Sequence, residues 1–190
     1  MAFDGALFEA RDINAWRGDR HILRDVSFAV RPGEFLKVTG PNGVGKTTLL
    51  RVVCGLLPAE TGEMLWRGQP IRGRRDEFNA ELGHLGHLNS LKGDLTAREN
   101  LKFLAGLRTS LTPAVIDATL DRVGILSRGD LPARSLSAGQ KRRLSLARLL
   151  LADAALWILD EPVTNLDTAG IELVETLIVD HVANGGMAIA

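Results

Sequence analysis

Three glycines and a proline stand directly before a run of helix-forming residues in the segment GPNGVGKTTLL, Gly40–Leu50. The preceding residues Phe35–Gly40 (FLKVTG) read as a strand, and apolar residues after Lys46 recur at a helical spacing as far as Gly55–Pro58. A strand that enters a helix through a glycine-rich turn directs several backbone N–H groups out of the turn. The segment therefore predicts a fold built around a strand–loop–helix unit that holds an anion.

Residues Gly40–Thr47 fit the phosphate-binding pattern Gly-x-x-x-x-Gly-Lys-Thr at every specified position. The glycines let the backbone wrap a β-phosphate, Lys46 would reach the β- and γ-phosphates, and the Thr47 hydroxyl would ligate Mg²⁺. A glycine-rich turn with a solvated lysine is the alternative, which the strand–loop–helix context disfavours. We expect nucleotide contacts from Gly40, Pro41, Asn42, Gly43, Val44, Gly45, Lys46, Thr47 and Thr48.

Two carboxylates follow a short apolar run in ALWILDEP, where Leu156–Leu159 lead into Asp160 and Glu161. A fully buried parallel strand has this composition, and α/β sheets bind ligands at the carboxyl ends of their strands. We expect Asp160 to hold Mg²⁺, directly or through water, and Glu161 to polarise an attacking water as a general base. An isolated Asp-Glu pair would fit a solvated turn, but together with the phosphate loop this pair predicts nucleotide hydrolysis.

The segment LSAGQ, Leu136–Gln140, precedes a helix and carries a third possible ligand site. Ser137 and Gln140 have the spacing of a capping box, which alone would explain them. The first helical turn then contains the cations Lys141, Arg142 and Arg143, which oppose the helix macrodipole. Either an anion lies nearby or these three side chains are solvated.

The remaining elements predict an α/β fold with a largely parallel core sheet. Leu7–Ile13 and Val26–Val30 read as strands, and GGMAIA at the C-terminal end reads as one more. Between about residues 94 and 134 the pattern is mostly helical, with helix caps predicted at Thr96 and Thr112. We expect these residues to form a helical subdomain inserted into the sheet.

Composition excludes several classes of protein. Lys+Arg and Asp+Glu are equal at 23 each, so net charge gives no argument for nucleic-acid binding. The single cysteine, Cys54, cannot form an internal disulfide and is expected in the core. The longest apolar stretch, Leu149–Leu159, is too short to span a bilayer, which needs about 20 residues. The N-terminus has no basic start or apolar core of a signal peptide.

The phosphate loop, LSAGQ, LWILDEP and then TNLD (Thr164–Asp167) occur in an order and spacing that resemble the nucleotide-binding subunits of ABC transporters. The resemblance covers essentially residues 1–190 as one domain. It implies a P-loop NTPase fold with an N-terminal antiparallel β part, and ATP with Mg²⁺ as cofactors. It also implies a head-to-tail dimer in which Ser137, Gly139 and Gln140 contact the γ-phosphate held by the partner, with Asp167 at the dimer contact.

Three features that the resemblance implies fit poorly. The aromatic residue that stacks on adenine would be Trp16, but the best register places Arg17 there. The loop glutamine of the family falls on His87 or Leu88, and neither is a glutamine. The family's switch histidine should follow the strand GGMAIA, and His21, His84, His87 and His181 all lie elsewhere. Either the chain is cut short at Ala190 or the protein hydrolyses ATP without this histidine, and we expect the first.

Within the family the segments LGHLNSLKGDLTARENLKF and SAGQKRRLSLARLLLADAALWILDEP most resemble the ATP-binding subunits of the haem exporters of bacterial cytochrome c maturation (Ccm). That resemblance implies a peripheral protein on the cytoplasmic face of the inner membrane, bound to a membrane-spanning exporter subunit. An ABC subunit for another substrate is the main alternative. A soluble, non-transport ABC ATPase is less well supported, since no long coiled coil or second cassette is present.

Overall fold

The computed structural model describes residues 7–105 and 111–190. The chain divides into two compact units, which we describe separately. Unit 1 holds the described residues up to His84 together with Ala154–Asp160 and Ile178–Ala190. Unit 2 holds Leu85–Asp153 and Glu161–Leu177, so the peptide bond between Asp160 and Glu161 is one of the joins between the units.

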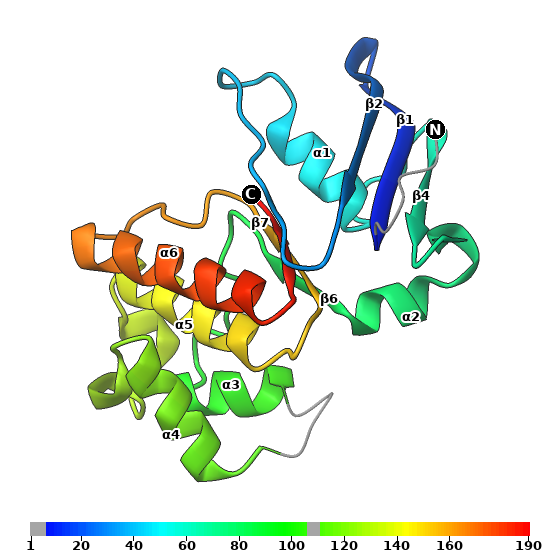
Figure 1. Ribbon diagram of the computed structural model, residues 1–190. Coiled ribbons are helices and arrows are strands. Elements are labelled where there is room, and N and C mark those ends of the chain that lie inside the picture. Colours follow the sequence, from blue (N-terminus) through cyan, green and yellow to red (C-terminus); the bar gives the residue numbers. More distant parts are fainter. Residues whose placement is uncertain (1–6, 106–110) are drawn as a thin grey trace. The chain divides into compact units, whose positions relative to one another are not determined.

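Unit 1 begins with an antiparallel sheet in the strand order β2-β1-β4-β5. Its strands are β1 (Phe8–Arg17), β2 (Arg20–Val30), β4 (Thr61–Trp66) and β5 (Gln69–Pro70). Figure 1 shows β1, β2 and β4 side by side. The two predicted N-terminal strands are therefore confirmed, although both are longer than expected because positive-φ residues at Asp12 and Asp25 let them continue through irregular pairing.

The second sheet has the order β3-β8-β7-β6, and β8 pairs in parallel with both β3 and β7. Its strands are β3 (Phe35–Leu36), β6 (Leu82–Leu85), β7 (Leu156–Leu159) and β8 (Met187–Ile189). The predicted strands in LWILDEP and GGMAIA are confirmed. The strand predicted over Phe35–Gly40 is shorter, although its pairing continues as the Val38 N–H donates to the Ala190 carbonyl at 2.6 Å.

Helix α1 (Lys46–Val53) contributes to the hydrophobic core of unit 1. Its buried residues pack in one cluster with side chains from both sheets and with Phe78 of α2 (Arg75–Ala80). Cys54, directly after α1, belongs to the same cluster, as expected from its residue type. The core thus packs α1, the helix that the phosphate loop enters, against β2 and β7.

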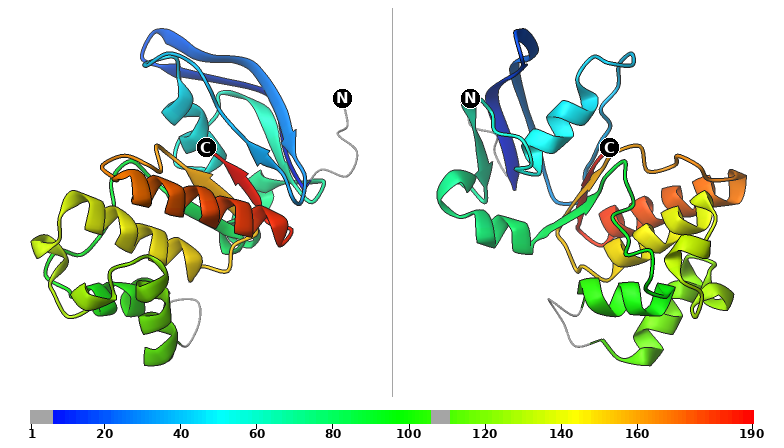
Figure 2. Two further views of the ribbon diagram at one scale, coloured as in Figure 1. Left: turned by 60° about the vertical axis from the view of Figure 1, so that its left-hand side comes forward. Right: turned by 180° about the vertical axis from the view of Figure 1, so that it is seen from behind.

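Unit 2 is helical. It contains α3 (Ala97–Ala105), α4 (Pro113–Arg122), α5 (Ala138–Leu150) and the first part of α6 (Thr168–Ala183). The predicted caps are confirmed: the Glu99 N–H donates to Thr96 Oγ1 at 3.1 Å, and Thr112 accepts from the Val115 N–H. Helices α3 and α4 lie beside α5 in both views of Figure 2. The predicted helical segment, residues 94–134, falls within this unit.

No helix in the described parts of the chain has the length and apolar character that crossing a membrane requires.

Candidate functional site

The phosphate loop connects β3 to α1. Its glycines have positive φ angles, which residues with a Cβ adopt only with strain. Gly43 has φ +79°, and Gly45, the residue before α1, has φ +116°. A Cβ atom on Gly45 would lie 2.7 Å from Ile22 Cγ2, because β2 passes directly beneath the loop. Gly45 is thus required by both its backbone conformation and its packing.

Lys46 is the first residue of α1, and its side chain folds back over the loop. Its Nζ donates hydrogen bonds to the carbonyls of Gly40 at 2.7 Å and Pro41 at 3.1 Å. Lys46 is half-buried, and these two bonds hold its ammonium group against the first residues of the loop. A phosphate in the loop would therefore meet a positive charge without rearrangement of the helix.

Thr47 and Asp160 come together in unit 1 although 113 positions separate them in sequence. The Thr47 hydroxyl donates to Asp160 Oδ1 at 3.1 Å, and the Asp160 residue is only 6% exposed. Two ligands in adjacent octahedral positions around Mg²⁺ lie about 2.9 Å apart. Because both groups offer oxygen at close to this separation, the residues present fit a magnesium ion.

The Cys54 thiol, which the Asp160 carboxylate influences, is not a third ligand of this kind. Burial, with a smaller contribution from the Asp160 carboxylate, raises the pKa of the Cys54 thiol to about 12. The thiol therefore stays protonated and is a core group rather than a nucleophile. Among the described residues, no group of three or more His, Cys, Asp and Glu side chains could hold a metal ion by themselves.

Glu161 is the first residue of unit 2 after Asp160. Its φ is +49°, an uncommon value for a residue with a Cβ. Its Oε2 accepts from the Thr164 hydroxyl at 3.3 Å and lies 3.3 Å from His87 Nδ1. The sequence predicted that His87 or Leu88 occupies the place of the family's glutamine, but gave no reason to expect His87 beside Glu161. The only signal in the sequence was the missing glutamine itself.

The LSAGQ segment forms the N-terminus of α5. Ser137 Oγ accepts from the Gln140 N–H at 3.2 Å and Gln140 Oε1 accepts from the Ser137 N–H at 3.0 Å, so the capping box is confirmed. Beside it in unit 2 lies a cavity of about 430 Å³, whose lining includes Ser137, Gly139, Gln140, Arg143 and Asp167. The predicted signature residues thus share one hollow with the predicted dimer-contact aspartate.

The three cations after LSAGQ have three different environments. Lys141 Nζ donates to the Arg134 carbonyl, and Arg143 donates to the Val123 carbonyl and to Asp167 Oδ1 at 3.2 Å. The Gly170 N–H, and then Arg143, hold the pKa of Asp167 below its ordinary value. Arg142 is buried and donates to backbone carbonyls. The sequence predicted that all three side chains either face an anion or are solvated. That prediction was wrong for Arg142, which is buried against backbone carbonyls.

The ABC transporter family model matches residues 23–164. This chain belongs to the ABC transporter family. The cytochrome c biogenesis ATP-binding export protein CcmA of Nitrosococcus oceani is 49% identical over 174 residues, covering 91% of this chain and 79% of that protein. CcmA 2 of Cupriavidus metallidurans is 42% identical over 185 residues, covering 97% of this chain and 88% of that protein.

Solved structures of ABC proteins have the same fold. CbiO1 from Clostridium perfringens, part of the ABC transporter complex cbiONQ, has a TM-score of 0.79 at 27% identity and covers 98% of this chain and 78% of its own. A putative ABC transporter ATP-binding protein from Pyrococcus furiosus has a TM-score of 0.83 at 26% identity. The match covers 96% of this chain and 90% of that protein's chain. As an ABC ATPase, the chain is the ATP-hydrolysing subunit of a transporter.

The two candidates for adenine stacking in this ABC protein, Trp16 and Arg17, are the last two residues of β1. Trp16 stacks on His21, with ring centroids 3.7 Å apart and planes 4° from parallel, on the face that carries Asn14. Arg17, the last residue of β1, is exposed and pairs with Arg20 of β2, beyond a register shift between Ala15 and Trp16.

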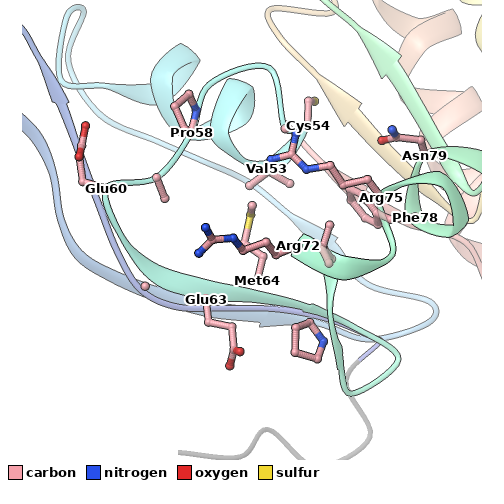
Figure 3. A pocket seen from close by; sticks show the side chains of 15 residues that line it. Val53, Cys54, Pro58, Glu60, Glu63, Met64, Arg72, Arg75, Phe78 and Asn79 are labelled. Carbon is pink, nitrogen blue, oxygen red and sulfur yellow. The ribbon is translucent and has the colours of Figure 1, made fainter.

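A second hollow of the ABC protein, about 510 Å³, lies at the C-terminal end of α1 within unit 1. Figure 3 shows Arg72 and Arg75 extending along its wall, with Met64 and Phe78 at its apolar side. None of the phosphate-loop residues 40–48 is among its described lining residues. This cavity is therefore separate from the nucleotide loop.

Proposed function

We propose that this chain drives haem export for c-type cytochrome biogenesis by hydrolysing ATP on the cytoplasmic face of the bacterial inner membrane. The supporting observation is its 41–49% identity to CcmA export proteins over at least 91% of its length. The chain also contains the phosphate loop, the LSAGQ segment and the two carboxylates after the buried strand. In this role the chain is peripheral and reaches the membrane through a membrane-spanning exporter subunit of the Ccm system.

For ATP binding we assign Gly40–Thr48 to the triphosphate, with their backbone N–H groups and the Lys46 ammonium facing the β- and γ-phosphates. Thr47 and Asp160 would hold Mg²⁺, which when bound neutralises charge on the phosphate oxygens. Their 3.1 Å contact supports this assignment. Glu161, whose Oε2 is already engaged by Thr164 and His87, would accept the proton of the attacking water on Oε1.

A second copy of the chain would complete each site. The cavity beside Ser137, Gly139 and Gln140 is lined by the N-terminus of α5 and by Arg143, a combination that suits an anionic γ-phosphate. We propose that this face closes on the nucleotide held by the partner in a head-to-tail dimer. Asp167, which lines the same cavity, would then lie at the dimer contact.

For adenine we favour Arg17 over Trp16. The Arg17 side chain is exposed, and a guanidinium plane can stack on a base. Trp16 is instead engaged with His21. An Arg17→Ala variant that bound ATP normally, with weakened binding in Trp16→Ala, would reverse this assignment.

We propose that the helical insert around residues 96–127 presents the surface for the membrane partner. Its helices α3 and α4 expose the large apolar side chains of Phe103 and Val115, which a partner subunit could cover.

Deletion of the gene tests the proposed substrate. Without this protein, mature c-type cytochromes should be lost, while b-type cytochromes, which need no export of haem for attachment, should persist. The gene for this protein should restore the c-type pool, and a Lys46→Ala version should not. Normal levels of c-type cytochromes in the deletion strain would reassign this ABC subunit to another substrate.

A further inference from the structure

One face of α5 holds the loop at residues 86–90, the loop that carries His87. Arg142 Nη1 donates to the Gly86 carbonyl at 2.7 Å, Ser145 Oγ to the Asn89 carbonyl at 3.1 Å, and Arg148 Nη1 to the Ser90 carbonyl at 3.3 Å. The three donors are spaced three residues apart and therefore lie along one side of the helix. The loop follows the helix because its backbone is fixed at these three carbonyls.

Arg142 fixes a second segment of chain as well. Its Nε donates to the Pro162 carbonyl at 3.0 Å and its Nη2 to the Glu161 carbonyl at 2.5 Å. The residue is only 2% exposed, and a buried cation is tolerated only where its N–H groups are hydrogen-bonded. The planar guanidinium provides several donors in fixed directions, so one side chain joins the backbone of Gly86 to that of Glu161.

Joining these two carbonyls brings two side chains together. His87, next to Gly86, places Nδ1 3.3 Å from Glu161 Oε2, and the Thr164 hydroxyl meets the same oxygen at 3.3 Å. Both side chains of the His87–Glu161 pair are more than half exposed, so little else in unit 2 restricts them. Arg142 is hydrogen-bonded to the backbone beside each of the two side chains.

We propose that Arg142 and His87 are positioning residues for Glu161, with Arg142 fixing its backbone and His87 fixing its carboxylate. This proposal rests on the proposed role of Glu161 as general base. With Oε2 held by His87 and Thr164, the carboxylate keeps one rotamer and turns Oε1 to the attacking water. A displacement of about 1 Å at a reacting group can cost about 100-fold in rate, so this restraint affects kcat rather than ATP affinity.

The test is steady-state ATPase activity of the full-length protein assembled with its membrane partner. His87→Ala should lower kcat about 10- to 100-fold and leave KM for ATP within about twofold. His87→Asn, which keeps an N–H donor close to the position of Nδ1, should retain most of the activity. Val179→Ala, an exposed change on α6, is the control and should behave as wild type.

A double-mutant cycle with Glu161→Gln separates a positioning role from a general structural one. In single-turnover assays, His87→Ala should lower the rate in the presence of Glu161 and have no further effect after Glu161→Gln. An unchanged kcat in His87→Ala, or the same loss in both backgrounds, would overturn the proposal for His87. Near-normal turnover in Glu161→Gln alone would instead remove the proposed general base.

Arg142 is tested by Arg142→Lys, since a lysine keeps the charge but cannot bridge two loops. Amide hydrogen exchange should increase together at residues 86–90 and 161–164, and kcat should fall while ATP still binds. Exchange that increases at only one of the two segments would contradict the joint restraint. If this buried variant fails to fold, Arg142→Gln, which keeps a side-chain N–H donor without the charge, is measured in the same way. A full kcat with unchanged exchange at residues 86–90 and 161–164 would overturn the role of Arg142.

Discussion

The Thr47 hydroxyl donates a hydrogen bond to Asp160 Oδ1 across 3.1 Å, joining the start of α1 to the end of β7. Both elements contribute to the same hydrophobic cluster, which holds the two oxygens in place. A hydroxyl and a carboxylate at this separation form part of an oxygen-ligand site for a small divalent cation. The site therefore depends on the packing of α1 against β7 as much as on the loop sequence.

Thr47→Val removes the hydroxyl and keeps the shape of the side chain. We expect the Mg²⁺ concentration for half-maximal ATPase activity to rise about tenfold, because one oxygen ligand is lost. A titration of activity with Mg²⁺ at saturating ATP measures this. Thr176→Val, an exposed position on α6, is the matched control. An unaltered Mg²⁺ requirement in Thr47→Val would argue against a ligand role for the hydroxyl.

Lys46→Ala should weaken ATP binding about 10- to 100-fold, since hydrogen bonds from a charged donor contribute about 1.5–3 kcal/mol. Calorimetric titration of ATP into the purified protein gives the dissociation constant. Lys37→Ala, at an exposed lysine of the same unit, should bind ATP as wild type does. Equal affinity for Lys46→Ala and wild type would contradict the phosphate-loop assignment.

Glu161→Gln should keep ATP bound and slow its hydrolysis at least ~100-fold, the range expected when a general base is lost. The amide still accepts from the Thr164 hydroxyl, so the local fold is retained. Single-turnover hydrolysis of radiolabelled ATP separates binding from chemistry. Turnover close to wild type would mean that another group activates the water.

Gly45→Ala should destabilise the protein by about 1–3 kcal/mol, because it combines a left-handed backbone with a contact of 2.7 Å to Ile22 Cγ2. Denaturant unfolding measures the change in the free energy of unfolding. Gly73→Ala provides the control, since among the described residues nothing lies within 4 Å of a Cβ at that position. Equal destabilisation by both changes would show that the loop tolerates a side chain.

His181 should make stability depend on pH. Its ring stacks on Trp157 at 3.9 Å and its Nε2 is 3.1 Å from the Met187 carbonyl, while burial lowers its pKa below the ordinary 6.5. The folded protein then binds fewer protons at this site than the unfolded chain, so stability falls as the pH drops below about 6.5. His181→Phe keeps a stacked ring without a proton. It should reduce the loss of melting temperature between pH 7.5 and 5.5, and an unchanged loss would contradict this.

Features that depend on a few neighbouring residues were predicted correctly. The caps at Thr96, Thr112 and Ser137 follow from hydrogen bonds that span only three residues, and they occur as expected. The buried strand Leu156–Leu159 follows from its unbroken apolar run. Strand ends were predicted less well, since β1 and β2 extend through bulges that depend on their pairing.

The roles of Arg142 and His87 could not be predicted. In the sequence Arg142 is one of three consecutive cations, and nothing local distinguishes the buried one from its neighbours. The distinction arises because α5 lies between two loops, and only Arg142 faces both of their carbonyls. His87 was one of two candidates, with Leu88, for the position of the glutamine, but its contact with Glu161 links residues far apart in sequence.

By itself the sequence determined the chemistry available to this protein: a phosphate loop, two carboxylates after a buried strand and a capped signature helix. These are local patterns, because each depends on backbone geometry and residue type within a few positions. Tertiary structure alone decided which distant groups meet, placing Thr47 against Asp160 and His87 against Glu161. Such contacts depend on how α1 packs on β7 and how α5 holds its loops, and no short segment encodes that packing.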